Sequence, residues 1–133
     1  NLGNAYGALG DAAKARDLLK RALTIKEFEY GREHRALAPT LNNLGNAYGA
    51  LGDAAKKRDT LERALAIYER EYGPEHREVA ITLTNLGSAY GALGDAAKQR
   101  DLLERAKAIF EREFGPEHPH SQVCGEILAS LSA

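Results

Sequence analysis

Asparagine side chains recur in pairs along this 133-residue chain, and they are its best candidates for a binding site. The members of each pair are three residues apart, so on a helix they would share one face. An amide both donates and accepts hydrogen bonds, so such a row could hold the backbone of an extended peptide. A solvated helix face, or hydrogen bonding between neighbouring helices, would explain the same pattern. The pairs are Asn1 with Asn4, Asn43 with Asn46, and Asn85 with Ser88.

Glycines lie close to these amides, and they widen the candidate site. Gly49 and Gly91 fall near the end of the same segments, where each costs a helix about 1 kcal/mol relative to alanine. They could let a ligand backbone approach closely, or they could let two helices pack closely. The candidate ligand-binding residues are therefore Asn4, Asn43, Asn46, Gly49, Asn85 and Ser88.

Other reactive side chains do not assemble into a catalytic or metal site. The histidines His34, His76 and His118 recur once per 42 residues, whereas zinc needs several ligands that converge. We expect them to lie in loops or at helix starts. Cys124 has no base with an orienting partner, so it is no candidate nucleophile. The sequence therefore predicts no enzyme, no metal and no cofactor.

The glycine run Gly3, Gly7 and Gly10 is not a phosphate-binding loop. Such a loop follows a strand and, in the Walker form, ends in Gly-Lys-Ser/Thr, whereas Gly10 is followed by Asp11, which would repel phosphate. The repeated Arg-Asp pairs, such as Arg58-Asp59, are best explained as solvated or interhelical ion pairs.

Charge and composition narrow the class of partner. Eighteen Lys and Arg residues against nineteen Asp and Glu give a net charge of -1, so no global field would attract nucleic acid. No apolar run is long enough to span a bilayer, so we expect no membrane partner. A single cysteine suits a reducing compartment, and we expect a cytoplasmic protein.

The elements that position the amides come from an internal repeat. The segment Asn1–Gly10 recurs at residues 43–52 and, with one change, at 85–94, which gives a period of 42 residues. The boundaries are residues 1–42 with a truncated first helix, 43–84, 85–118, and a C-terminal capping helix at 119–133, all in one domain. Alanine, leucine and charged residues dominate, so each copy favours two helices.

In the second copy the repeat pattern places the first helix from about Arg35 to Leu51. Because proline is tolerated in a helix only near its start, we expect this helix to begin later, near Pro39. Gly52 would end it, and Asp53 would cap a second helix that reaches Tyr72. The same glycine and aspartate recur in every copy, so a turn is expected at Gly10 as well. Apolar stripes follow each helix, and Asp59 and Arg63 are four residues apart, as are their counterparts. The stripes contain Leu41, Leu44, Tyr48 and Leu51 on the first helix, and Leu61, Ala64, Leu65 and Tyr68 on the second.

The motif Leu41-x-x-Leu44-Gly45-x-x-Tyr48, followed by Gly52-Asp53 and Arg63-Ala64-Leu65, resembles the tetratricopeptide (TPR) repeat. Its 42-residue period is similar to that of kinesin light chains and nephrocystin-like arrays. The chain departs from the motif at one position of the second helix, where a small residue is expected. The first copy has Ala15 there, but the second has Lys57 and the third has Gln99. We expect the packing to differ there.

The resemblance implies an all-α, right-handed α-solenoid whose first helices line a concave groove that binds a peptide or a partner helix. TPR domains that clamp a carboxylate use Lys and Arg on the first helix, which this chain lacks at those positions. A neutral or moderately apolar ligand is therefore expected. Two alternatives stay open: a structural spacer that associates with itself end to end, and the sensor arm of a larger signalling ATPase.

Overall fold

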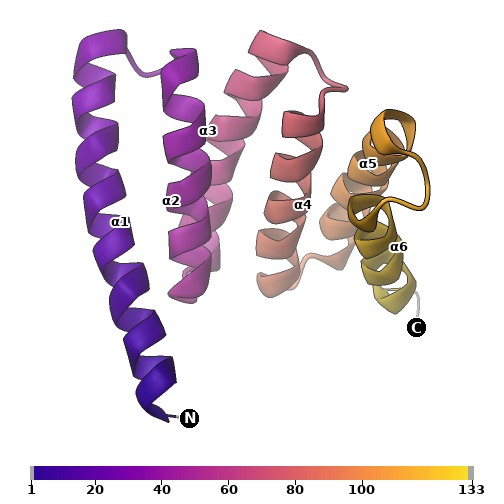
Figure 1. Ribbon diagram of the computed structural model, residues 1–133, viewed down its shortest axis with the longest axis horizontal. Coiled ribbons are helices and arrows are strands. Elements are labelled where there is room, and N and C mark those ends of the chain that lie inside the picture. Colours follow the sequence, from indigo (N-terminus) through magenta and orange to yellow (C-terminus); the bar gives the residue numbers. More distant parts are fainter. Residues whose placement is uncertain (1, 132–133) are drawn as a thin grey trace. The chain divides into compact units, whose positions relative to one another are not determined.

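The computed structural model describes the backbone of residues 2–131 and the side chains of residues 8–131. Throughout this part of the chain the regular structure is helical, which confirms the all-α prediction (Figure 1). The helices form two compact units, Asn1–Ile67 and Tyr68–Ala133. The first unit holds α1 (Leu2–Tyr30), the 3-10 turn η1 (Arg35–Leu37), α2 (Ala38–Ala50) and most of α3 (Ala54–Tyr72). The second holds the end of α3, then α4 (Arg77–Ala92), α5 (Ala96–Phe114) and α6 (Pro119–Leu131).

The predicted turn between the two helices of a copy forms in copies two and three. Gly52 adopts φ +79°, a left-handed conformation that glycine reaches at little cost, and α2 ends there. The Asp53 carboxylate then accepts a hydrogen bond of 3.1 Å from the backbone N–H of Lys56, which caps α3. Asp95 caps α5 in the same way, with 3.0 Å to the N–H of Lys98.

The turn predicted at Gly10 is absent, and this expectation was wrong. The helix α1 runs without a break from Leu2 to Tyr30, through both Gly10 and Asp11. In copy two, the residues before Asn43 help to hold the first helix in place: the Lys26 ammonium of α1, for example, donates to the Thr40 hydroxyl at 2.8 Å. A straight helix keeps the backbone hydrogen bonds that a turn would break.

The apolar stripes predicted for copy two form the core, and the structure confirms them. In the first unit Leu41, Leu44 and Tyr48 of α2 are buried, as are Leu61 and Ala64 of α3. Leu51 and Leu65 are only half-buried. In the second unit the corresponding core contains Val79, Leu83, Leu86, Leu103 and Phe110.

The start of α2 follows the proline prediction. Residues Arg35–Leu37 form a 3-10 turn, and the α-helix begins at Ala38, one residue before Pro39. The equivalent helix in the second unit, α4, has no proline and begins at Arg77, the counterpart of Arg35. The proline therefore delays the helix by three residues, because a helix interior cannot accommodate its ring.

The repeated histidines start helices, as predicted. In each case the imidazole Nδ1 accepts a hydrogen bond from the backbone N–H two residues later, while the ring stacks on an aromatic side chain from the end of the preceding helix. The hydrogen bonds join His34 to Ala36 (3.0 Å), His76 to Glu78 (3.1 Å) and His118 to His120 (3.2 Å). The stacking partners are Tyr30, Tyr72 and Phe114, with ring centroids 4.7, 4.5 and 4.5 Å away.

The charged residues pair differently from the sequence prediction. Arg63 does not pair with Asp59 four residues before it; its guanidinium lies 3.2 Å from the Glu27 carboxylate of α1. In the second unit Arg105 pairs with Glu69 at 2.8 Å. Asp59 instead accepts from its neighbour Arg58 at 3.0 Å, as the predicted Arg-Asp pairing requires. Arg63 therefore forms its ion pair with a residue of another helix and not with Asp59 of its own helix.

The C-terminal helix was expected from about Pro119 to Ser132. The structure has α6 at Pro119–Leu131, and Ser132 lies outside the described residues. Among the described helices none is both long and apolar enough to cross a membrane.

Candidate peptide-binding site

Helix α2 has two opposite faces, and the predicted amides lie on the open one. Leu41, Leu44 and Tyr48 face the interior of the first unit, whereas Asn43 and Asn46 are exposed. Because residues three apart share a helix face, the two amides lie next to each other. The helix carries no charged residue along its length. Its open face therefore offers hydrogen-bonding groups on a neutral background.

The second unit repeats this arrangement in part. On α4, Ser88 is exposed and Asn85 is half-buried. The helix has charged residues only at its start, Arg77 and Glu78, and is neutral from Val79 onward. The remaining candidates, Asn4 and its partner Asn1, lie outside the residues whose side chains the structure describes.

Gly49 faces α3, and a side chain there would meet a neighbour. A Cβ atom added to Gly49 would lie 2.8 Å from Cδ of Lys57, and one added to Gly91 would lie 2.6 Å from Oε1 of Gln99. The repeat motif expects a small residue on the second helix, but here the second helix has the large residue and the first helix has the glycine. The two facing positions therefore remain complementary in size. Close helix packing explains both glycines.

Burial of this lysine has an electrostatic consequence. The Lys57 stem packs against Gly49, and the burial lowers the pKa of its ammonium group from the usual 10.5 by desolvation. A charge is therefore held partly away from water between α2 and α3.

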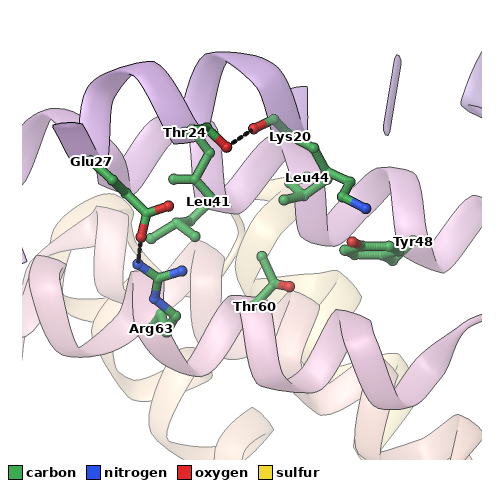
Figure 2. A pocket seen from close by; sticks show the side chains of 9 residues that line it. Lys20, Thr24, Glu27, Leu41, Leu44, Tyr48, Thr60 and Arg63 are labelled. Atoms are coloured by element: carbon green, nitrogen blue, oxygen red, sulfur yellow. Dashed lines mark hydrogen bonds and ion pairs between the residues drawn. The ribbon is translucent and has the colours of Figure 1, made fainter. Parts of the chain in front are cut away.

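A cavity of about 290 Å³ opens on the other side of α2, within the first unit. Figure 2 shows Tyr48 and the two leucines of α2 along one wall, with Lys20, Thr24 and Glu27 contributed by α1 and Thr60 and Arg63 by α3. This cavity was not foreseen from the sequence. Lys20 and Glu27 are seven residues apart, so they share one face of α1, and this spacing was the available signal.

The charges at this cavity are already paired within the protein. The Glu27 carboxylate lies 3.2 Å from Arg63 and 3.7 Å from Arg32. Arg63 also donates to the backbone carbonyl of Arg32 at 3.3 Å. These contacts stabilise the stacking of α1 on α3 and leave the cavity without a cationic clamp at Arg63.

The described residues contain no group of three or more acidic, histidine or cysteine side chains that could hold a metal ion. The Cys124 thiol is buried against Thr84, and burial raises its pKa. A protonated, buried thiol is a poor nucleophile.

This fold defines a helical repeat protein. One family model described as tetratricopeptide repeat matches residues 1–56 and 58–111, and a second model of the same description matches residues 37–78. The chain therefore belongs to the tetratricopeptide repeat family, whose members typically mediate protein-protein interactions without catalysis.

Solved structures with TPR-like repeats are also similar to this chain. The nearly identical TPR-like repeats of a kinesin light chain-like protein from Podosopora anserina match 97% of this chain with a TM-score of 0.84 and 26% identity, and a variant of that protein matches equally well. This chain covers 62% of that protein's length. BtubC (BKLC) from P. vanneervenii matches 92% of the chain with a TM-score of 0.79 and 24% identity, over 48% of its own length, and shows the fold. No curated protein matches the chain.

Proposed function

We propose that this chain is a non-catalytic scaffold that binds an extended peptide or a partner helix on the open faces of α2 and α4. The observation that carries the proposal is the pair of exposed amides, Asn43 and Asn46, on a helix without charge. Membership of a family that typically binds proteins supports it.

The chemistry of these faces defines the ligand. A side-chain amide can accept from a peptide N–H and donate to a peptide carbonyl, so it satisfies a backbone rather than a particular side chain. The neutral helices offer no charge-assisted donors for a carboxylate. We therefore expect a neutral or moderately apolar segment, and weak selection among sequences.

The second unit has a candidate site of its own on α4. Ser88 replaces the second amide of the pair there, and its hydroxyl can donate one hydrogen bond where an amide donates two. Asn85 is half-buried, so its amide has fewer open directions. Binding at α4 is accordingly weaker than at α2. A cytoplasmic location completes the proposal, supported by the single, unpaired Cys124.

The test is capture from a library of neutral, acidic and basic peptides, followed by titration of the selected peptide into the chain. Replacing Asn43 and Asn46 with alanine should weaken binding about tenfold or more, because each lost hydrogen bond contributes roughly 1 kcal/mol. The matched control is Gln122→Ala, which removes an exposed amide from α6. Equal affinity of the double variant and the control for the peptide would contradict the proposal, as would selection of acidic peptides alone.

A further inference from the structure

One face of α1 lacks the cover that its counterparts have. Leu18 and Ile25 are 62% and 60% exposed on this face. In copy three the corresponding residues, Leu102 and Ile109, are 7% and 4% exposed, and in copy two Ile67 is 3% exposed. Leu19 and Ala22 complete the face and are half-buried, whereas Leu61 and Ala64 in copy two are fully buried. We call Ala15, Leu18, Leu19 and Ala22 the uncovered face.

The other copies show what covers this face. In the first unit, Gly45 of α2 lies on Leu61 of α3, where an added Cβ would be 2.7 Å from the leucine Cγ, and Gly49 lies on Lys57. In the second unit, Gly87 of α4 lies 3.5 Å from Leu103 of α5 by the same measure. At Leu61, Lys57 and Leu103 the cover is thus the first helix of the same copy, folded back through the turn at Gly52 or Gly94.

Copy one contains the covering sequence but holds it away from the face. Residues 1–14 are identical to residues 43–56, so the segment has the leucine, tyrosine and glycine positions that cover α3. In α1, however, this segment continues straight through Gly10. Residues 7 and 15, the counterparts of Gly49 and Lys57, are therefore about 12 Å apart along the helix, and the segment cannot reach the face of its own chain.

We propose that a second copy of the chain supplies the cover. Two α1 helices would pack antiparallel about a twofold axis near Asp11, and the N-terminal segment of each would lie on the uncovered face of the other. The pairing of copy two then places Gly3 of one chain against Leu19 of its partner, and Gly7 against Ala15. This is an exchange of identical elements, which needs only a straightened turn and no new surface.

This register predicts which exposed residues of α1 lie in the contact between the two chains. Leu18 lies within the reach of the partner's N-terminal segment, next to Leu19. Phe28, which is 93% exposed, is nine residues from Leu19, which places it on the opposite side of α1 from that leucine and outside the contact. The two positions form a matched pair of large, exposed, apolar side chains on one helix.

The first experiment is cross-linking. The chain carrying Gly7→Cys and Ala15→Cys, with the native thiol removed by Cys124→Ala, is oxidised and run on a non-reducing gel. We expect a disulfide-linked dimer, because residues 7 and 15 of one straight helix are too far apart to bridge. A monomer with an internal disulfide would show that copy one folds back on itself, and no disulfide would show that α1 is unpaired; either result overturns the proposal. Ala15→Cys alone is the control and should not cross-link.

The second experiment is sedimentation over a range of concentrations. The unaltered chain should reach a dimer and go no further, whereas species that keep growing would indicate end-to-end stacking and overturn the proposal. Leu18→Glu should raise the dissociation constant of the dimer about a hundredfold, because the substitution occurs twice in a twofold contact. Phe28→Glu should leave it unchanged. A loss of dimer in Phe28→Glu, or none in Leu18→Glu, would contradict the register.

Discussion

The segments at residues 1–14 and 43–56 have the same sequence, yet residues 2–14 differ in structure from residues 44–56. In copy two the segment ends α2, turns at Gly52 and starts α3 with Asp53 as the cap. In copy one it is part of the single helix α1. Fourteen identical residues therefore leave the choice between helix and turn open, and packing decides it. Where α2 can lie on both α1 and α3, the turn forms.

The same comparison explains the glycines. In copy two, Gly45 and Gly49 let α2 approach α3 closely enough to meet the side chains of Leu61 and Lys57. In copy one the equivalent glycines lie inside a straight helix, where each costs about 1 kcal/mol relative to alanine. In copy two the glycines therefore contribute to stability through the packing of α2 on α3.

The largest effect is expected at the glycine that copy two uses for packing. In Gly45→Ala the new Cβ would lie 2.7 Å from Cγ of the fully buried Leu61. Overpacking costs about 1 to 3 kcal/mol, and alanine's helix propensity offsets about 1 of it, so we expect a net loss of up to about 2 kcal/mol. Urea denaturation measures it.

The control for this substitution lies in the second unit. Gly87→Ala places its Cβ at an ordinary 3.5 Å from Cγ of Leu103, so it should be neutral or stabilising. Equal losses at both positions would show that close approach at Gly45 is not the cause.

The next effect tests the two conformations directly, because one substitution should have opposite signs in the two copies. Gly52→Ala forces alanine into φ +79° and should destabilise the chain by about 1 kcal/mol. Gly10→Ala lies in a helix with open space around the new Cβ and should stabilise it by about 1 kcal/mol. Thermal unfolding of the two variants measures both. If Gly10→Ala destabilised the chain as Gly52→Ala does, copy one would have the turn.

The smallest effect concerns the position where copy one has Ala15 and copy two has Lys57. Lys57→Met keeps the apolar stem and removes the partly buried charge, so we expect a gain of about 0.5 kcal/mol at pH 7. The pKa of Lys57 is lowered in the folded chain, so the folded state loses its proton first as the pH rises toward 10.5. The cost of burying the charge then disappears, and the gain should shrink between pH 7 and pH 10.

Urea denaturation of both chains at the two pH values measures this change. Burial raises the pKa of Tyr68 to about 12, so this residue lowers the free energy of unfolding as the pH rises. Both chains contain Tyr68, so its effect cancels in the difference between them. A gain that stays constant with pH would show that the charge is not responsible.

Much of the candidate site followed from local rules. The amides of α2 share an open face because residues three apart always do on a helix, and the cap at Asp53 follows from its residue type and place. The cavity beside α2 did not follow, because its walls come from three helices. The packing of Gly49 against α3 did not follow either, because it depends on where the Lys57 side chain lies.

The sequence by itself determined the 42-residue period, the helical content, the histidine positions that start helices, and the delayed start of α2 near Pro39. Each of these depends on groups a few residues apart, whose geometry the backbone sets locally. Only the tertiary structure decided whether Gly10 turns, whether Arg63 pairs with Asp59 or Glu27, and which apolar face stays uncovered. Those outcomes depend on partners far along the chain. Identical local sequences therefore fold differently when their neighbours differ.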